Sequence, residues 1–480
     1  MQPGNFVRDV VANGDGAAVL LIERALDGRR HEHTRAALLD RAARLATTLH
    51  QLGVRRGDLV LTIVGNRVEW VESMLACFGA GFVVLPCTEQ FRAHDLQLRI
   101  GIAKPVVVIA DVRNRALIEE ADLNCPVLWL PDAAAYDADP TPYAELHPTD
   151  PALVIFTSGT SGPPKAVLHA QSYLTGQQLQ ATQWVGAETT DLVWCTASPG
   201  WSKSARNGFI AAWLRGARAL IHDGRFDGKE RLAIAAEESV TVWCMTPTEY
   251  RLIAAHTTIP AMPQLRTLLA AGEALDPETL RVWRAATGIE VRDGYGQTET
   301  GHLVGNHLGE PARAGSMGKP INGIDAWVED GELVVDPATV PTFFLGYLGQ
   351  EPPTGPWRTG DRVDTDADGY LYFQGRADDV IVSAGYRIGP FEVESVLAEH
   401  PAVAEAAVVA VADAERGEVV RAVVVLAPGA EASEALAQEL QEHVKARTAP
   451  YKYPRIVDFV TELPKTASGK VRRSVLREGR

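Results

Sequence analysis

The chain has 480 residues, of which 46% are hydrophobic and 22% charged, and its formal net charge is -15. This composition is typical of a globular protein with a large core, and it excludes collagen-like, disulfide-stapled and fully disordered classes. The acidic balance disfavours binding to nucleic acid or to anionic membranes, so a polyanionic ligand needs a local basic site. At roughly 150 residues per domain, the length predicts about three compact units.

The cysteines and the N-terminal residues indicate the compartment. The five cysteines are scattered and form no C-x-x-C pair, which predicts a reducing compartment and no structural zinc. The N-terminal sequence reaches acidic residues early and has no apolar core of signal-peptide length. The longest uncharged stretch, 166–187, contains His169 and several glutamines and would insert poorly into hydrocarbon. We therefore expect a cytoplasmic protein without a membrane span.

Apolar periodicity predicts alternating helices and strands over the first 270 residues. A helical face is formed by Leu38, Ala42, Leu45, Leu49 and Leu52, and residues 57–64 then read as a buried strand. Amphipathic stretches alternate with further short apolar runs at 106–110, 152–156, 192–195, 240–245 and 267–270. This alternation predicts parallel strands covered by helices, with ligands bound beyond the carboxyl ends of the strands.

The character of the sequence changes after about residue 320. Short strands and turns follow, with Asp368-Gly369 as a turn signal, which predicts a β-rich subdomain. Residues 379–444 are acidic, whereas residues 445–480 hold ten Lys and Arg against three Asp and Glu. The last hundred residues are therefore expected to form a separate small domain.

Residues 157–165, Thr-Ser-Gly-Thr-Ser-Gly-Pro-Pro-Lys, follow directly after the apolar run 152–156. The glycines permit close approach of the backbone to a ligand, and successive N–H groups can bind an anion. Lys165 adds a compact positive charge suited to phosphate. Because the spacing differs from G-x-x-x-x-G-K-[ST], the segment predicts a phosphate-binding loop of another kind.

This loop resembles the signature of the adenylate-forming superfamily, which comprises acyl-CoA synthetases, the adenylation domains of peptide synthetases, and luciferases. Further segments match the family in its order, namely 271–275, 294–300, 315–320, 358–361, 375–394 and 464–470. Segments 198–204 and 449–455 are most similar to those of the medium-chain and aryl acyl-CoA synthetases. The resemblance covers nearly the whole chain, and the order of the motifs makes it specific.

The resemblance implies an α/β fold with two domains. The large N-terminal domain, residues 1–377, is expected to hold the acyl and ATP pocket. It should consist of two doubly wound α/β subdomains and a β-rich subdomain shaped as a distorted barrel. The C-terminal domain, residues 378–480, is expected to be a small mobile α+β domain with its hinge at Asp378.

The resemblance also implies a reaction in two steps that uses ATP, Mg²⁺ and coenzyme A. A carboxylate attacks the α-phosphate of ATP to give an acyl-adenylate and pyrophosphate, and a thiol then displaces AMP. Because one anion attacks another, the site needs positive charge and hydrogen-bond donors at the phosphate more than it needs a base.

The family's motifs give each matching residue an expected role. Catalytic roles fall to Lys470, which bridges the substrate carboxylate and the α-phosphate, and to Thr298 and Arg387. Glu299 is the expected Mg²⁺ ligand. The residues expected to bind the ATP phosphates are Thr157, Ser158, Gly159, Thr160, Ser161, Gly162 and Lys165. The residues expected to bind adenosine are Gly272, Glu273, Ala274, Asp293, Gly294, Tyr295, Asp361 and Arg376.

Coenzyme A is expected to meet the C-terminal domain in a second orientation of that domain. Residues 383–386 should then line the pantetheine channel, and two lysines should receive the CoA phosphates. The expected CoA-binding residues are Ser383, Ala384, Gly385, Tyr386, Lys445 and Lys452.

The acyl pocket is expected to accept an acid larger than acetate, of medium-chain, aryl or cyclic type. Gly296 stands where acetate-specific members of the family carry a tryptophan. Trp201 and Phe209 are expected to line the pocket. Arg206 and its polar neighbours depart from the apolar residues expected there. An inward Arg206 favours an acid with a second polar or anionic group, whereas an outward Arg206 is a surface charge.

Three other interpretations stay open. The acyl group could pass to a carrier-protein thiol or an amine, or the chain could perform one half-reaction and a partner enzyme the other. The chain could also be a catalytically silent nucleotide- or acyl-binding regulator, although intact Lys470, Lys165, Glu299 and Asp361 disfavour this. The sequence gives neither the identity of the acid nor whether the chain acts as a monomer or a homodimer.

Overall fold

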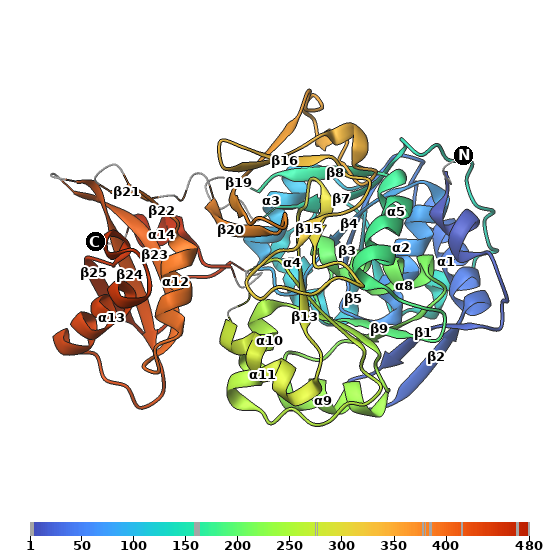
Figure 1. Cartoon of the computed structure of the whole chain (residues 1–480). Helices are drawn as coiled ribbons and strands as arrows, with labels where there is room; N and C mark the ends of the chain where they lie inside the picture. Colours follow the sequence, from blue (N-terminus) through green and yellow to red (C-terminus); the bar gives the residue numbers. More distant parts are fainter. Residues whose placement is uncertain are drawn as a thin grey trace.

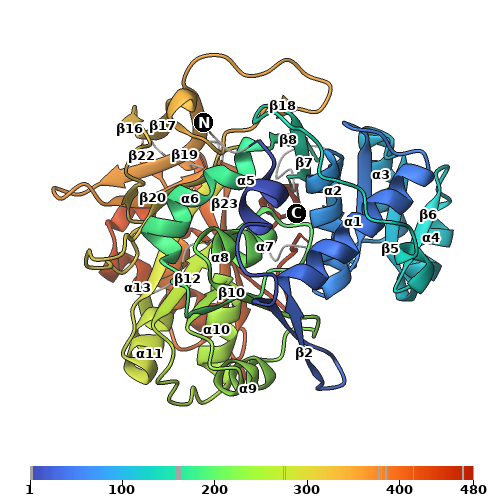
Figure 2. The same ribbon diagram turned by 90° about the vertical axis from the view of Figure 1, so that its right-hand side faces the viewer.

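The structure of the chain is a computed structural model, and it describes residues 4–157, 164–273, 275, 277–376, 379, 381–383, 386–413, 416–466 and 470–478. A large N-terminal domain and a smaller C-terminal domain lie side by side (Figure 1). In the view turned by 90°, α3, α4, β5 and β6 gather at one end of the N-terminal domain (Figure 2). The α/β fold with a small C-terminal domain, as expected from the sequence, is confirmed.

The first subdomain is built on a mixed sheet with parallel central strands. Strand β3 pairs in parallel with β4 and with β5, and every residue of these three strands is buried. Such burial is typical of parallel strands that are covered on both faces. In sheet order the strands are β18 (Gly346–Tyr347), β8 (Ala166–Ala170), β7 (Pro151–Phe156), β4 (Val83–Cys87), β3 (Leu59–Ile63), β5 (Val107–Asp111) and β6 (Val127–Leu130).

The second subdomain has a parallel centre with antiparallel edges. Strand β11 lies between β9 and β12 and is parallel to both, whereas β2 and β14 pair antiparallel with their neighbours. In sheet order the strands are β15 (Lys319–Pro320), β14 (Gly301–Gly305), β13 (Val291–Gln297), β12 (Thr267–Ala271), β11 (Val242–Met245), β9 (Leu192–Cys195), β10 (Arg218–His222), β1 (Val19–Arg24) and β2 (Arg30–Thr34).

Helices with local start signals cover these sheets. The Thr34 hydroxyl caps α1 by accepting from the Ala37 amide, and Thr246 and Glu249 form a reciprocal capping box at α10. The helices of the N-terminal domain are α1 (Arg35–Gln51), α2 (Val68–Ala80), α3 (Ala93–Ala103), α4 (Arg115–Ala121), α5 (Ser172–Gly176), α6 (Gln178–Gln180), α7 (Ser202–Ala205), α8 (Ala211–Leu214), α9 (Gly228–Glu237), α10 (Pro247–His256) and α11 (Pro277–Thr287).

Two further sheets complete the fold. The β-rich subdomain has an antiparallel sheet of β16 (Ala326–Glu329), β17 (Glu332–Val335), β19 (Trp357–Thr365) and β20 (Leu371–Arg376). The C-terminal domain has β22 (Tyr386–Ile388), β21 (Ile381–Ser383), β24 (Gly417–Leu426), β23 (Val403–Asp413) and β25 (Ile456–Val460). Its helices are α12 (Pro390–Ala398), α13 (Glu434–Arg447) and α14 (Arg473–Glu478). None of the helices in the described part of the chain is long and apolar enough to cross a membrane.

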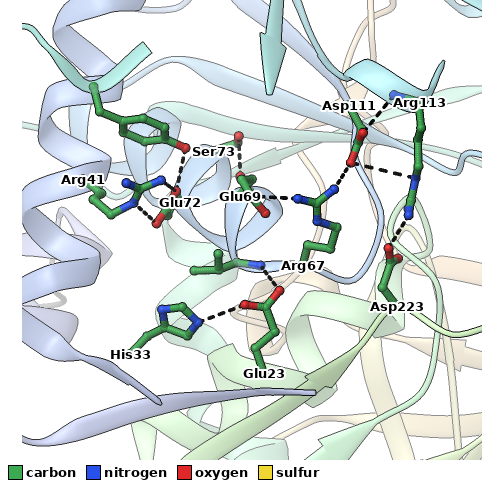
Figure 3. Close-up of polar contacts among 12 residues, drawn as sticks. Glu23, His33, Arg41, Arg67, Glu69, Glu72, Ser73, Asp111, Arg113 and Asp223 are labelled. Carbon is green, nitrogen blue, oxygen red and sulfur yellow. Dashed lines mark hydrogen bonds and ion pairs between the residues drawn. The ribbon is translucent and has the colours of Figure 1, made fainter. Parts of the chain in front are cut away.

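A network of ion pairs ties the carboxyl ends of the two α/β sheets together (Figure 3). Arg67, which precedes α2, contacts Glu69 and Asp111. Arg113 contacts Asp223 at 2.6 Å. Because Asp111 ends β5 and Asp223 follows β10, these pairs connect one sheet to the other.

Glu72 on α2 has a buried carboxylate that forms an ion pair with Arg41 (Figure 3). Its oxygens lie 2.5 Å from Arg41 Nε and 2.6 Å from the Tyr136 hydroxyl, which donates to it. Burial raises the pKa of Glu72 above its usual value, and the charge and hydrogen bonds of Arg41 oppose this rise.

We expect Arg41→Met to lower the free energy of unfolding by about 3 kcal/mol at pH 7, because it leaves an uncompensated buried carboxylate. Glu72→Gln should cost about 1 kcal/mol, because the exposed side of Arg41 can turn to water. The folded pKa of Glu72 lies above its unfolded value. As the pH drops through the folded pKa, the carboxylate becomes protonated in the folded state, and the destabilisation caused by the buried charge is lost. Urea unfolding should therefore show the Arg41→Met deficit shrinking from pH 7 to pH 5. An equal deficit at both pH values would contradict this account.

Candidate active site

An open cleft of about 2080 Å³ lies between the N-terminal and C-terminal domains. Its walls include residues that follow β7, β9, β11 and β12, together with residues of β13, β19 and β20. The C-terminal domain contributes residues of α12 and the segment that begins at Lys470. The cleft thus lies at the carboxyl ends of parallel strands, which is where α/β sheets bind their ligands.

Asp361 on β19 is the centre of a polar cluster on one wall. Arg376 on the neighbouring β20 lies 3.2 Å from one carboxylate oxygen. The Tyr295 hydroxyl donates to the other oxygen, as does Gln297 Nε2 at 2.8 Å. Burial raises the pKa of Asp361, and the charge of Arg376 opposes the rise. The structure thus brings together three residues that were predicted to bind adenosine.

Gln297 belongs to this cluster, although the sequence alone assigned it no role. Its amide nitrogen also donates to the Thr359 carbonyl at 2.6 Å, and its oxygen accepts from Trp357 Nε1 at 3.0 Å. These bonds fix the amide so that it presents a donor to Asp361. The position of Gln297 within the 294–300 motif was the available signal, but the contact with β19 depends on the fold.

The segment after β12 forms the adjoining wall of the cleft. Gly272 has a φ of 105°, and a Cβ there would lie 2.8 Å from Lys203 Nζ. Lys203 Nζ in turn donates to the Ala271 carbonyl at 3.0 Å, so this lysine is fixed beside the segment. Glu273 forms an ion pair of 2.8 Å with Arg251. The sequence reasoning missed Lys203, and Ala274 lies outside the described residues.

Asp293 and Gly294, on β13, also line the cleft. The Gly294 amide donates to the Asp293 carboxylate at 2.8 Å. Burial raises the pKa of Asp293 to about 8. A carboxyl group with this pKa exchanges its proton near neutral pH, so it can act as a hydrogen-bond donor or as an acceptor.

The two ends of the predicted phosphate loop lie together. The Thr157 amide donates to the Lys165 carbonyl at 3.0 Å, and both residues line the cleft. The predicted phosphate-binding residues between them, Ser158, Gly159, Thr160, Ser161 and Gly162, lie outside the described residues.

Lys165, Tyr347 and Glu299 form a second polar group in the cleft. Lys165 Nζ lies 4.9 Å from the centre of the Tyr347 ring, and the Tyr347 hydroxyl donates to Glu299 Oε1 at 3.0 Å. Burial raises the pKa of Tyr347, with a further contribution from Glu299, so the phenol stays protonated. Tyr347 was not found from the sequence, because it lies 48 positions from Glu299.

The cleft fits a magnesium ion that is bound mainly through phosphate oxygens. Among the residues that the structure describes, no cluster of three or more His, Cys, Asp or Glu could form a protein cage for a metal. Mg²⁺ commonly uses one or two carboxylates together with substrate phosphates and water. Glu299 faces the same cleft as Thr298 and Lys165 and supplies a carboxylate of this kind.

Lys470 enters the cleft from the C-terminal domain. The residue is exposed to solvent, yet the protein around its amine partly desolvates the charged form and so lowers its pKa. The charge of Lys203 lowers this pKa further. Glu273 and Asp361 act in the opposite direction, and Arg376 lowers the pKa further. Glu273, Asp361 and Arg376, which were predicted to bind adenosine, line the same cleft as Lys470.

Other predicted catalytic and hinge residues are described only partly. Thr298 lines the cleft. The backbone of Arg387 lies on β22, and its side chain lies outside the described part of the structure. Asp378 lies outside the described residues, as do Ala384 and Gly385.

The predicted CoA-binding residues that the structure describes do not line this cleft. Ser383 is buried at the end of β21, and Tyr386 is 52% exposed and stacks on Tyr451 with ring centres 4.1 Å apart. Lys445 and Lys452 are held by ion pairs of 2.5 Å to Glu442 and Glu392, respectively. The structure therefore brings Lys470 to the cleft and leaves these groups apart from it.

Only some of the residues predicted to line the acyl pocket lie at the cleft. Trp201 and Gly296 line the cleft. Phe209 instead lies in the hydrophobic core, 1% exposed, against Trp70 and Trp213, so it is not a wall residue. Its ring packs edge-on against Trp70 of α2, with ring centres 5.4 Å apart.

A Cβ at position 296 would lie 1.9 Å from the Gly301 carbonyl oxygen. The close pairing of β13 and β14 therefore requires glycine here in this backbone conformation.

The chain matches two family models in order. The model of the AMP-binding enzymes matches residues 9–347, and that of the AMP-binding enzyme C-terminal domain matches residues 392–470. The human mitochondrial acyl-coenzyme A synthetase ACSM4 is 38% identical over 465 residues, which cover 89% of this chain and 80% of that protein.

Two solved structures share the fold over nearly the whole chain. The anthranilate CoA ligase AuaEII, in complex with anthranoyl-AMP, has a TM-score of 0.90 at 28% identity, with 99% of this chain and 97% of that chain covered. ATP-bound MatB from Rhodopseudomonas palustris has a TM-score of 0.88 at 26% identity, with 100% and 99% covered. With its two matching models and a cleft that carries the superfamily's motifs, the chain belongs to the AMP-binding, adenylate-forming enzymes.

Proposed function

We propose that this chain is an AMP-forming acid:CoA ligase that activates a carboxylic acid larger than acetate. The observation that carries the proposal is the entry of Lys470 into the cleft that contains Asp361, Arg376 and Glu273. The names of the relatives, which are acyl-coenzyme A synthetases and CoA ligases, support the same reaction.

In the first step, a carboxylate oxygen of the acid attacks the α-phosphorus of ATP. The bond from this phosphorus to the bridging oxygen of pyrophosphate breaks, which gives acyl-AMP and pyrophosphate. Lys470 stabilises the negative charge that gathers at the α-phosphate, and the Thr298 hydroxyl donates to it. Magnesium, held by Glu299 and phosphate oxygens, supplies further positive charge when bound.

In the second step, the sulfur of CoA attacks the carbonyl carbon of acyl-AMP, loses its proton, and AMP leaves with the electron pair of the broken carbon–oxygen bond. Tyr386, Lys445 and Lys452 lie apart from the cleft in this structure. We therefore propose that the structure corresponds to the orientation for the first step. A rotation of residues 378–480 about Asp378 then brings residues 383–386 to the cleft.

Adenosine is proposed to bind between β13 and β19. Tyr295 offers its ring to adenine, Asp361 accepts from the ribose hydroxyls, and Arg376 adds charge toward the phosphates. Asp293 is proposed to accept from the exocyclic amine of adenine. The ionised carboxylate is the better acceptor for this amine, because hydrogen bonds to a charged group are stronger.

We expect the affinity for ATP to rise roughly tenfold between pH 7 and pH 9, because the ionised fraction of a group with a pKa of about 8 rises about tenfold over this range. The ligand selects the deprotonated form, so binding tightens as the pH rises through the pKa of the free protein. Asp293→Asn should give a flatter profile. Titration calorimetry with both proteins at pH 7, 8 and 9 measures this, and parallel profiles would exclude the role of Asp293.

Product analysis tests the proposed function. The pure protein is incubated with MgATP and a panel of medium-chain, aryl and cyclic acids, with and without CoA, and the products are identified by mass spectrometry. Acyl-CoA and AMP are expected only when CoA is present. Acyl-AMP that accumulates in the presence of CoA would instead indicate a carrier-protein or amine acceptor, or a chain that performs one half-reaction. ATP binding without any pyrophosphate release would contradict a ligase.

A further inference from the structure

Arg206 is a buried cation on the acyl side of the cleft. It follows α7 and begins the π-helical turn Arg206–Ile210. The residue is only 4% exposed, yet it lines the cleft beside Trp201. Its Nε and Nη1 atoms are buried and have no hydrogen-bond partner. Because Arg206 is buried and is one of the residues that line the cleft, it is not the surface charge that an outward orientation would give.

No carboxylate in the described part of the chain forms an ion pair with Arg206. The groups that its charge reaches include His169 and His302, and burial together with Arg206 lowers the pKa of both. Burial raises the pKa of Tyr173, which keeps its phenol protonated. The two histidines and Tyr173 are therefore neutral, whereas Cys244 is an acidic neighbour whose pKa is lowered by a hydrogen bond from Cys195 and by the charges of Lys203 and Arg206.

Several of these neutral neighbours are themselves buried without a hydrogen-bond partner. Both ring nitrogens of His169 and of His302 lack one, as do the Tyr173 hydroxyl and Gln180 Oε1. Gln180 is tied to the same turn, because its Nε2 donates to the Arg206 carbonyl at 3.5 Å. Buried polar atoms are almost always paired, so a group of unpaired ones around a cation indicates a place for a polar ligand.

The chemistry of the ligand follows from that of Arg206. A buried guanidinium without a counter-charge is costly, and a planar carboxylate pairs with it through two parallel hydrogen bonds. The reacting carboxylate of the substrate belongs with Lys470 and Thr298 at the α-phosphate, so a different anionic group must reach Arg206.

We propose that Arg206 binds a second carboxylate on the acyl part of the substrate, so that dicarboxylic acids are the preferred substrate class of this enzyme. This inference rests on the proposed ligase function and specifies its substrate.

The test compares acids that differ in one carboxylate. Pyrophosphate release with MgATP and CoA is measured for linear monocarboxylic acids of four to ten carbons and for the dicarboxylic acids of the same carbon numbers. Benzoate is compared with the three benzenedicarboxylates in the same way. For at least one pair, kcat/KM for the dicarboxylic acid is expected to exceed that for its monocarboxylic partner by ~100-fold, because the monocarboxylic acid leaves Arg206 unpaired.

Arg206→Met keeps the length of the side chain and removes its charge. It should reduce kcat/KM for the preferred dicarboxylic acid by ~100-fold and leave that for the matched monocarboxylic acid unchanged or higher. Arg206→Lys should retain part of the preference. Cys244→Ala removes the acidic thiol near Arg206 and should leave the preference for the dicarboxylic acid intact. If Arg206 instead held the reacting carboxylate, Arg206→Met would slow both acids of a pair equally, which would overturn the proposal.

Wild-type enzyme alone also decides the question if a variant fails to fold. A monocarboxylic acid that is turned over as fast as every matched dicarboxylic acid would overturn the role of Arg206 while leaving the ligase function in place. Failure to release pyrophosphate with any acid, despite binding of ATP, would count against the ligase function itself.

Discussion

Lys470→Ala is expected to slow acyl-adenylate formation by ~10²–10³-fold, which is the usual cost of removing one preorganised charge or donor at a transition state. The lysine is the contribution of the C-terminal domain to the cleft, where its charge acts together with those of Lys203 and Arg376. Single-turnover release of pyrophosphate measures the effect. KM for ATP should change far less than kcat, because the added charge matters most when the phosphate is attacked.

Two controls separate this role from a loss of structure. Thioester formation from supplied acyl-AMP and CoA should remain close to the wild-type rate in Lys470→Ala, because Lys470 is proposed to act only in the first step. Lys229→Ala, which removes an exposed lysine on α9, should leave both steps unchanged. Loss of both half-reactions in Lys470→Ala would contradict a role confined to adenylation.

The lowered pKa of Lys470 also gives this prediction a pH dependence. The protonated amine is the active form, so the rate of adenylation should fall as the pH rises through the pKa of Lys470. Because the surrounding protein and Lys203 lower this pKa, the fall should begin at a lower pH than for an ordinary lysine.

Asp361→Asn is expected to raise KM for ATP by ~10–100-fold, because hydrogen bonds to a charged group contribute about 1.5–3 kcal/mol. Asp361 is 5% exposed and is held by Arg376, Tyr295 and Gln297, so its position is fixed before the ribose arrives. Since the ribose hydroxyls are bound equally in the ground and transition states, kcat should change little.

Asp364 on the same strand provides the matched control. It is exposed, and its exchange for asparagine should leave KM for ATP unchanged. Steady-state kinetics with ATP as the varied substrate give both values. If Asp361→Asn lowered kcat and left KM unchanged, the proposed contact with ribose would be wrong.

The sequence predicted those parts of the fold that depend on local pattern. The apolar run 192–195 coincides with β9, and Leu38, Ala42, Leu45 and Leu49 are buried on α1. Leu52, placed on the same face by its spacing, is 39% exposed, because α1 ends at Gln51. A periodic pattern does not show where a helix stops.

The site was predictable where a motif carries its own chemistry and not where it depends on pairing between distant segments. Tyr295 and Asp361 were found from separate motifs, but their contact requires β13 and β19 to lie side by side. Tyr347 reaches Glu299 only because β18 pairs with β8. Phe209 shows the opposite error, since an aromatic residue near the acyl motif faces the core.

The fate of one oxygen atom tests the account most directly. The acid is labelled with ¹⁸O in its carboxylate and incubated with the enzyme, MgATP and CoA, and the AMP is then analysed by mass spectrometry. If the carboxylate attacks the α-phosphate and the thiol then displaces AMP, each AMP formed carries one ¹⁸O from the acid. Unlabelled AMP, or label found in inorganic phosphate together with ADP, would contradict the acyl-adenylate route.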